Sequence, residues 1–345
     1  MAGRKLQGSS LWIYYLLSIW VIGIEAGLVD VASCSDFKQH SYTDDSVTSY
    51  GNALRDIETA LSETAEMVVE ANNAILAVKE KKATWFERTR TVLPFLTLQV
   101  DDPANQQARW DAVFKRTRIL RGLLEARDSQ RTKIYCGDAH LVKYLILSDG
   151  STVKSLPEDD DSEETVVGFK YYDPIIAQDP EADVWWPENV RACDPANREM
   201  AATVNFHYIL VCHSALEQSG LTIGDNHLID WGDSQYGKPS SMWRKQYLSY
   251  WAGHTSFTLL HELIHLFFLC RDHPLDPPVK NEYNNKMLHE AYGYYGAAGL
   301  LSQKPSMVET NVDSTGILFL AWFMKLCNWS EGTAENEKYM SDECN

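Results

Sequence analysis

The sequence predicts an α+β fold that is mostly helical, with a small antiparallel sheet packed on one buried helix. Three observations support this: two long stretches with helical periodicity at 47–78 and 103–127, short strand-like apolar runs at 141–147 and 206–211, and a very apolar segment at 255–270. Hydrophobic residues make up 45% and charged residues 23% of the 345, so the chain can bury a large core and is not disordered.

The N-terminus resembles a targeting segment. Arg4 and Lys5 precede an apolar run at 11–24, which is followed by the small residues Ala26 and Gly27. This order is typical of a secretory signal peptide, which we place at 1–26. The run is shorter than the roughly 20 residues of a spanning helix, although an uncleaved signal anchor is the alternative. The rest, 27–345, is expected to form a single domain, with a helical half at about 34–135 and a motif-bearing half at about 136–345.

The first half of the sequence is expected to form two helices. Between 47 and 78, apolar residues recur at steps of three and four, which indicates an amphipathic helix packed on its own domain, or else a coiled coil. The second helix spans 103–127, with Asp101 or Asp102 as its cap and Pro103 in its first turn.

The middle of the chain predicts strands. The run at 141–147 ends in a Ser-Asp-Gly-Ser turn, and the run at 206–211 leads into Cys212. The acidic run at 158–164 is expected to be a solvated loop.

Charge and cysteines narrow the class of protein. With 31 Lys and Arg against 48 Asp and Glu, the net charge is −17, which argues against nucleic acid as a partner. The seven cysteines form no Cys-x-x-Cys pair, so a cysteine zinc ribbon has no support. Export would permit disulfides while leaving at least one thiol unpaired, and it would make Asn328 a candidate for glycosylation.

The segment 255–270 contains the candidate metal ligands and the candidate general base. It reads TSFTLLHELIHLFFLC and is expected to form a buried helix that the proline at 274 stops. His261 and His265 stand one turn apart, where both imidazoles can reach one zinc ion, and Glu262 is placed to act as a general base. Burying these polar groups in an apolar helix is costly unless they bind something.

Such a site needs a third protein ligand. A metzincin would have Gly at 268 and His at 271, but this chain has Phe268 and Arg271. By chemistry alone, the candidates downstream are Asp272, His273, Asp276, Glu282, His289 and Glu290.

Two further motifs resemble a known family. Residues 289–293 read HEAYG and residues 311–314 read NVDS. Their order resembles that in the deuterolysin and lysine-specific metalloendopeptidase family, the aspzincins, in which HExxH is followed by Asp-x-x-Tyr-Gly and then Asn-x-Asp. Residues 84–86 (TWF) and the strand ending at Cys212 also have counterparts in order. The resemblance thus covers about residues 34–313, and the chain is similar to a divergent, fungal-type member.

The resemblance implies a role for each matched residue. His261 and His265 match the zinc histidines, and Glu262 matches the general base. Tyr292 matches a tyrosine near the oxyanion. Asp313 matches an aspartate of the substrate pocket, which in lysine-specific members recognises a lysine side chain.

The chain departs from the family at the third ligand, where His289 replaces the family's aspartate. We expect a three-histidine site with His289 as the third ligand. Glu290 is the alternative if the register slips by one residue, and loss of the ligand is a further possibility.

These features together predict a secreted zinc metalloendopeptidase with a zincin-like domain and one Zn²⁺ per chain. Its substrates would be proteins or peptides, with Asp313 favouring basic residues near the cut, and no stable membrane association is expected after signal cleavage. The rivals are a non-catalytic secreted zinc-binding protein that keeps the zincin frame, and a structural helix without a metal.

Overall fold

The structure is a computed structural model that describes residues 28–35, 37–40, 47–79, 103–125, 134–154, 165–178, 185, 193, 200–204, 206–217, 252–281 and 285–323. Helices and small sheets are both present, which confirms the α+β expectation in its coarse form.

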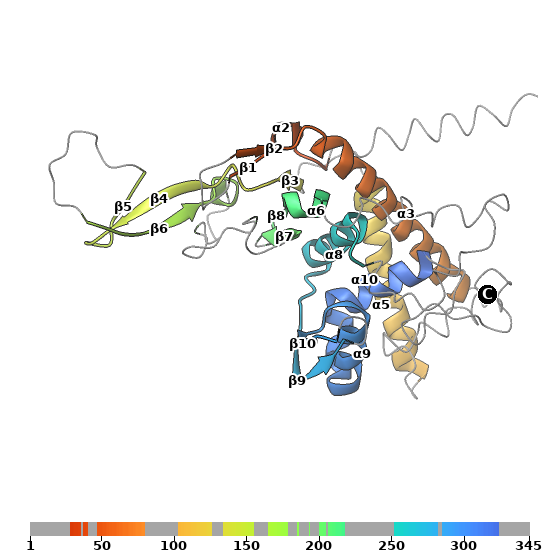
Figure 1. The fold of residues 1–345 in the computed structure, drawn as a ribbon. Helices are drawn as coiled ribbons and strands as arrows, with labels where there is room; N and C mark the ends of the chain where they lie inside the picture. The colour runs from red at the N-terminus through yellow and green to blue at the C-terminus, as the bar shows by residue number, and fades with distance from the viewer. Residues whose placement is uncertain are drawn as a thin grey trace, which may run out of the picture.

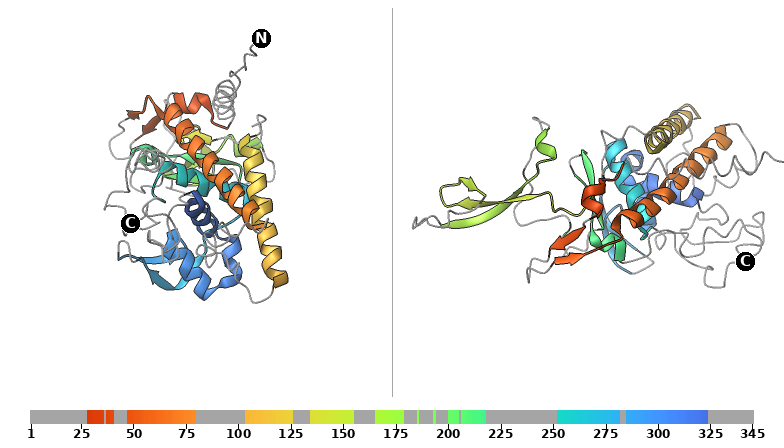
Figure 2. Two further views of the ribbon diagram at one scale, coloured as in Figure 1. Left: turned by 90° about the vertical axis from the view of Figure 1, so that its right-hand side faces the viewer. Right: turned by 90° about the horizontal axis from the view of Figure 1, so that it is seen from above.

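Long helices form the body of the molecule. Helix α3 packs against α5, α8 and α10, and Figure 2 shows α3 and α5 lying side by side. The helices are α2 (Val31–Ser35), α3 (Ala53–Lys79), α5 (Pro103–Glu125), α6 (His213–Glu217), α8 (Thr255–Phe268), α9 (Gly293–Gln303) and α10 (Val312–Phe323), with 3-10 turns η2 (Ile176–Gln178) and η5 (Pro305–Thr310).

Helix α3 buries the apolar stripe that its sequence predicts, because Ile57, Leu61 and Ile75 are all almost fully buried. The predicted start at 47 is wrong, because the helix begins at Ala53. Residues 47–49 instead form strand β2 (Val47–Ser49), which pairs antiparallel with β1 (Lys38–His40). This pairing holds the chain extended until Gly51.

A three-stranded sheet in the order β3-β8-β7 packs against α8. Its strands are β3 (Ile134–Cys136), β7 (Ala201–Val204) and β8 (Tyr208–Val211). The expectation of a purely antiparallel sheet is corrected, because β3 runs parallel to β8 while β7 runs antiparallel to it. A short turn joins β7 to β8 and imposes the antiparallel pairing, whereas the long connection from β3 allows the parallel one.

A second sheet projects from the helical body (Figure 1). It is antiparallel in the order β5-β4-β6, with β4 (Val142–Leu147), β5 (Thr152–Val153) and β6 (Val166–Tyr172). At its base, the Tyr208 hydroxyl donates to Asp173 and lies 2.9 Å from His140 Nε2, which ties the projecting strands to the central sheet.

The C-terminal part closes the other side of α8. Strands β9 (Pro274–Lys280) and β10 (Met287–Glu290) form a hairpin that packs on α9, and α10 packs on α3, α8 and α9. The main core cluster contains side chains from both expected halves of the chain, including Leu61, Leu263 and Phe319.

Helix α8 ends earlier than expected and for a different reason. It stops at Phe268 because Leu269 adopts a left-handed conformation with φ 52°. Pro274 lies beyond this turn, inside β9. The left-handed residue reverses the chain, so that the segment after it returns alongside the helix.

The cysteines form two disulfides, Cys34–Cys136 and Cys193–Cys212, which are compatible with the oxidising compartment that the N-terminus predicts. Cys270 is buried and forms no disulfide within the described residues. Within that same part of the chain, no helix combines the length and apolarity needed to cross a membrane. Several predicted features lie outside the described residues: the segment 1–26, Asp101, Asp102, residues 84–86, the acidic run 158–164, Glu282, Asn328 and two cysteines at 327 and 344.

The packing predicts that Leu263→Ala destabilises the protein by about 2–5 kcal/mol, because Leu263 is fully buried at the contact of α8 with the core. Chemical denaturation would measure the loss. Ile119→Ala on α5 is the matched control, because Ile119 is 43% exposed and its truncation should stay within about 0.5 kcal/mol. Equal losses in both variants would contradict this packing.

Candidate metal centre

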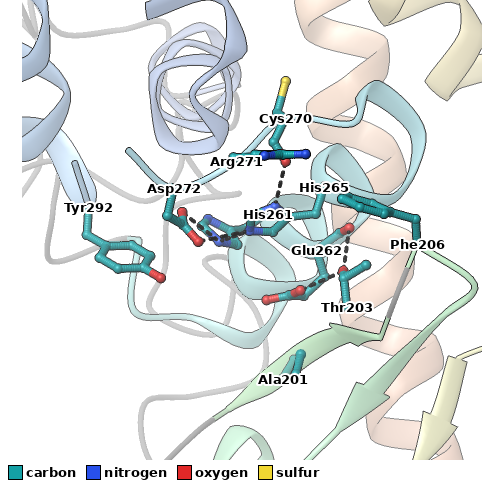
Figure 3. A pocket seen from close by; sticks show the side chains of 11 residues that line it. Ala201, Thr203, Phe206, His261, Glu262, His265, Cys270, Arg271, Asp272 and Tyr292 are labelled. Atoms are coloured by element: carbon teal, nitrogen blue, oxygen red, sulfur yellow. Dashed lines mark hydrogen bonds and ion pairs between the residues drawn. The ribbon is translucent and has the colours of Figure 1, made fainter. Parts of the chain in front are cut away.

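The two histidines of α8 point at a common spot. His261 and His265 lie one helical turn apart, and their Nε2 atoms are 3.0 Å from each other (Figure 3). Both side chains are largely buried, at 12% and 15% exposure. Two ring nitrogens this close stay together only if a proton or a cation lies between them.

The opposite nitrogens of both rings are already bonded. His261 Nδ1 lies 2.6 Å from Asp313 Oδ1, and His265 Nδ1 lies 2.9 Å from the Cys270 carbonyl oxygen. A carboxylate and a carbonyl can only accept, so both Nδ1 atoms carry the proton. Once an imidazole loses its second proton, its Nε2 lone pair is therefore free for a ligand, which is the arrangement of metal-binding histidines.

Asp272 completes the group. Its Oδ2 lies 3.3 Å from His265 Nε2, and its Oδ1 lies 3.9 Å from His261 Nε2. Oδ1 is buried and accepts no hydrogen bond from the described residues. An unsatisfied buried carboxylate oxygen beside two imidazole nitrogens is costly without a cation. His261, His265 and Asp272 could together hold a metal ion.

The backbone after α8 delivers Asp272 to this place. Beyond the left-handed Leu269, the Arg271 N–H donates to the Thr310 carbonyl and the Arg271 carbonyl accepts from the Val312 N–H. These bonds hold residue 271 extended against the start of α10, so Asp272 lies beside the two histidines.

The cluster is electrostatically complementary. Burial lowers the pKa of His261, but the charge and hydrogen bond of Asp313, together with the charges of Glu262 and Asp272, outweigh burial and raise that pKa to about 9. Burial also opposes the charged form of His265, whose pKa is nevertheless raised, chiefly by its hydrogen bond to Asp272. The pKa of Asp272 is lowered despite burial, because His265 and His261 favour its charged form. Without a metal, protons therefore hold this cluster together.

Glu262 lies on the side of α8 that faces the sheet. The Thr203 hydroxyl on β7 is 2.7 Å from Glu262 Oε2 and 3.0 Å from the Glu262 backbone carbonyl. Glu262 is buried, yet it lines the same pocket as the two histidines. Thr203 thus fixes the direction of the carboxylate.

Tyr292 stands at the start of α9 and covers the other side of the cluster. Its ring stacks on His261 with centroids 5.9 Å apart and planes at 24°. Burial and then the negative charge of Asp272 raise the pKa of Tyr292 well above its usual range, so the phenol keeps its proton. A protonated phenol at this place can donate a hydrogen bond to a ligand oxygen.

The pocket has a volume of about 480 Å³ and lies between α8 and strand β7. The close-up in Figure 3 shows the histidines and Asp272 above Glu262 and Thr203, with Tyr292 to one side. The lining residues are Ala201, Ala202, Thr203, Phe206, His261, Glu262, His265, Cys270, Arg271, Asp272 and Tyr292.

The structure does not bring the expected third ligand to this site. His289 and Glu290 are exposed on β10 and do not line the pocket. The β9–β10 hairpin holds these two residues away from α8 while it still delivers Tyr292, two residues later. The structure thus groups Asp272 with the two histidines, and it places neither His289 nor the alternative Glu290 among the described residues of this cluster.

Asp313 also has a place other than the one expected. It is 3% exposed, and its two oxygens are bonded to His261 Nδ1 and to the Gly293 N–H. It therefore lies behind His261, where it orients the imidazole, and it is not among the described residues that line the pocket.

Thr203 was missed at the sequence level. A threonine in a strand has no distinguishing signal, and only the pairing of β7 with β8 places it beside Glu262. Asp272 was among the candidates for the third ligand, and its short distance in sequence from His265 is the feature that could have favoured it.

No protein-family model, curated protein or solved structure matches this chain. The resemblance to the aspzincins therefore stays a prediction that depends on the order of the motifs.

The electrostatics predict that metal affinity rises with pH. His261 has a pKa of about 9 without metal, so at pH 7 a bound metal must displace its proton. Titration calorimetry with Zn²⁺ should show affinity increasing between pH 6 and pH 8 by about tenfold or more per unit. His261 releases one proton per ion bound, and the raised pKa of His265 adds to the proton release at the low end of this range.

Asp313→Asn is the matched control for this titration. The amide removes the negative charge that raises the His261 pKa, so the pH dependence should become shallower at neutral pH. A constant affinity across this range in the parent protein would contradict the protonation state inferred for His261.

Proposed function

We propose that this protein is a zinc-dependent peptide hydrolase. The observation that carries the proposal is the convergence of His261, His265 and Asp272 beside the Glu262 carboxylate, all in one pocket. A set of ligands for one metal ion with an adjacent, fixed carboxylate is the arrangement that metal-assisted hydrolysis by water requires.

The donor set suits zinc. Two imidazole nitrogens and one carboxylate oxygen form a three-ligand set, which leaves a further position for water or substrate. When bound, zinc would acidify a water molecule and polarise a carbonyl group. The unsatisfied Asp272 Oδ1 supports a cation at this place.

Glu262 is the proposed general base. Thr203 donates to Oε2, and the second carboxylate oxygen accepts no hydrogen bond from the described residues. That oxygen is available to take the proton of the attacking water and to pass it to the leaving amine. The fixed orientation lowers the cost of placing the carboxylate for the reaction.

Tyr292 is the proposed oxyanion donor. Its phenol remains protonated because its pKa is raised, and its ring lies against His261 at the pocket. A donor placed there would stabilise the negative charge that develops on the carbonyl oxygen.

The proposed substrates are proteins or peptides, and the proposed location is extracellular. The signal-like N-terminus and the two disulfides support an extracellular location. The buried position of Asp313 removes the basis for a preference for basic residues near the cut.

Glu262→Gln is the direct test of hydrolysis. The substitution keeps the size of the side chain but removes the proton acceptor, so cleavage of casein or of a quenched peptide should fall by about 10²–10⁴-fold. The bound zinc should remain at the level of the parent protein, because Glu262 is not a ligand.

Glu125→Gln on α5 is the matched control, because Glu125 is exposed and does not line the pocket. It should cleave at the parental rate. A Glu262→Gln variant with full activity would contradict the mechanism. A parent protein that binds zinc but cleaves nothing would instead favour the non-catalytic zinc-binding alternative.

A further inference from the structure

The carboxylates around the pocket are already engaged. Glu262 accepts a hydrogen bond from Thr203, and Asp272 is paired with His265. Asp313 is buried behind His261. In the proposed function, Asp272 binds the metal and Glu262 takes the proton of the attacking water, so neither carboxylate is assigned to recognise a basic side chain of a substrate.

Among the described residues that line the pocket, one cationic side chain remains available. It belongs to Arg271, the single Lys or Arg in that part of the lining, and this residue is exposed. Its guanidinium forms no ion pair or hydrogen bond with the described residues. Figure 3 shows it beside the ligand cluster, on the side away from Glu262 and Thr203.

The position of Arg271 is set by the core rather than by a mobile loop. Its N–H donates to the Thr310 carbonyl at 2.9 Å, and its carbonyl accepts from the Val312 N–H at 3.3 Å. The two neighbouring residues are also held, because Cys270 is buried and Asp272 joins the histidines. The backbone of Arg271 is thus anchored next to the proposed third ligand, and its side chain, which lines the pocket, can reach a group bound there.

We propose that Arg271 selects substrates that carry a carboxylate near the scissile bond, a selection that rests on the hydrolase function proposed above. A guanidinium binds a carboxylate through two parallel hydrogen bonds, which makes it more selective than an ammonium group. The carboxylate can come from an acidic side chain or from a free peptide C-terminus.

The overall charge sharpens this inference. With a net charge of −17, the summed field of the protein attracts cationic peptides and repels anionic ones. A preference for anionic peptides therefore cannot come from the general field, and it would have to originate at a local cation such as Arg271.

The test compares quenched peptides that differ at one position beside the cut, which carries Glu, Gln or Lys. Each peptide is made with an amidated and with a free C-terminus, so that the two sources of carboxylate are distinguished. For the zinc-loaded full-length chain, kcat/KM should be about tenfold higher for a peptide with the carboxylate than for its neutral counterpart.

Arg271→Gln should level this preference, and Arg271→Glu should invert it in favour of Lys. Lys115→Gln on α5 is the matched control, because it removes one exposed positive charge that does not line the pocket, and it should keep the preference. Equal rates for all peptides in the parent protein, or a preference that survives Arg271→Gln, would overturn the proposal.

A separate readout covers the case in which no peptide is cleaved, which would count against the hydrolase function alone. In that case, fluorescence anisotropy measures how tightly the zinc-loaded chain binds the same labelled peptides. Tighter binding of the carboxylate peptides that Arg271→Gln abolishes supports the selection, and equal binding overturns it.

Discussion

Helix α8 buries two histidines and a glutamate in the otherwise apolar stretch 259–268, and the cost of removing these groups from water must be met by partners. The four partners come from three separate parts of the chain: Asp313 on α10, the Cys270 carbonyl and Asp272 in the segment after the helix, and Thr203 on β7. The elements that pack against α8, namely α10 and the small sheet, are therefore also the ones that supply Asp313 and Thr203 and orient His261 and Glu262.

The contact between His261 and Asp313 links the parts of the site. Asp313 orients the imidazole through one oxygen and holds the Gly293 N–H through the other, so the start of α9 and its Tyr292 are positioned by the same carboxylate. A displacement of α10 would thus disturb the ligand and the proposed oxyanion donor together. Arg271, anchored to the start of α10, is tied to the same frame.

The local part of the site could be predicted from the sequence. The pair at i and i+4 with Glu262 between depends only on helical geometry, and the helices at 53–79 and 103–125 follow from their apolar periodicity. The third ligand, Asp272, could not be predicted in this way, because its position depends on the left-handed conformation of Leu269. That conformation is usually signalled in a sequence by a glycine, which is absent here. The same holds for Asp313 and Thr203, since their contacts form across 52 and 59 residues of chain.

The identity of the third ligand tests the central claim most directly. Metal analysis of the dialysed, zinc-loaded protein should find about one zinc ion per chain in the parent and in His289→Gln, because His289 is exposed on β10. Asp272→Asn should lose most of the zinc while keeping the fold, as measured by circular dichroism. Retention of zinc in Asp272→Asn together with its loss in His289→Gln would contradict the account.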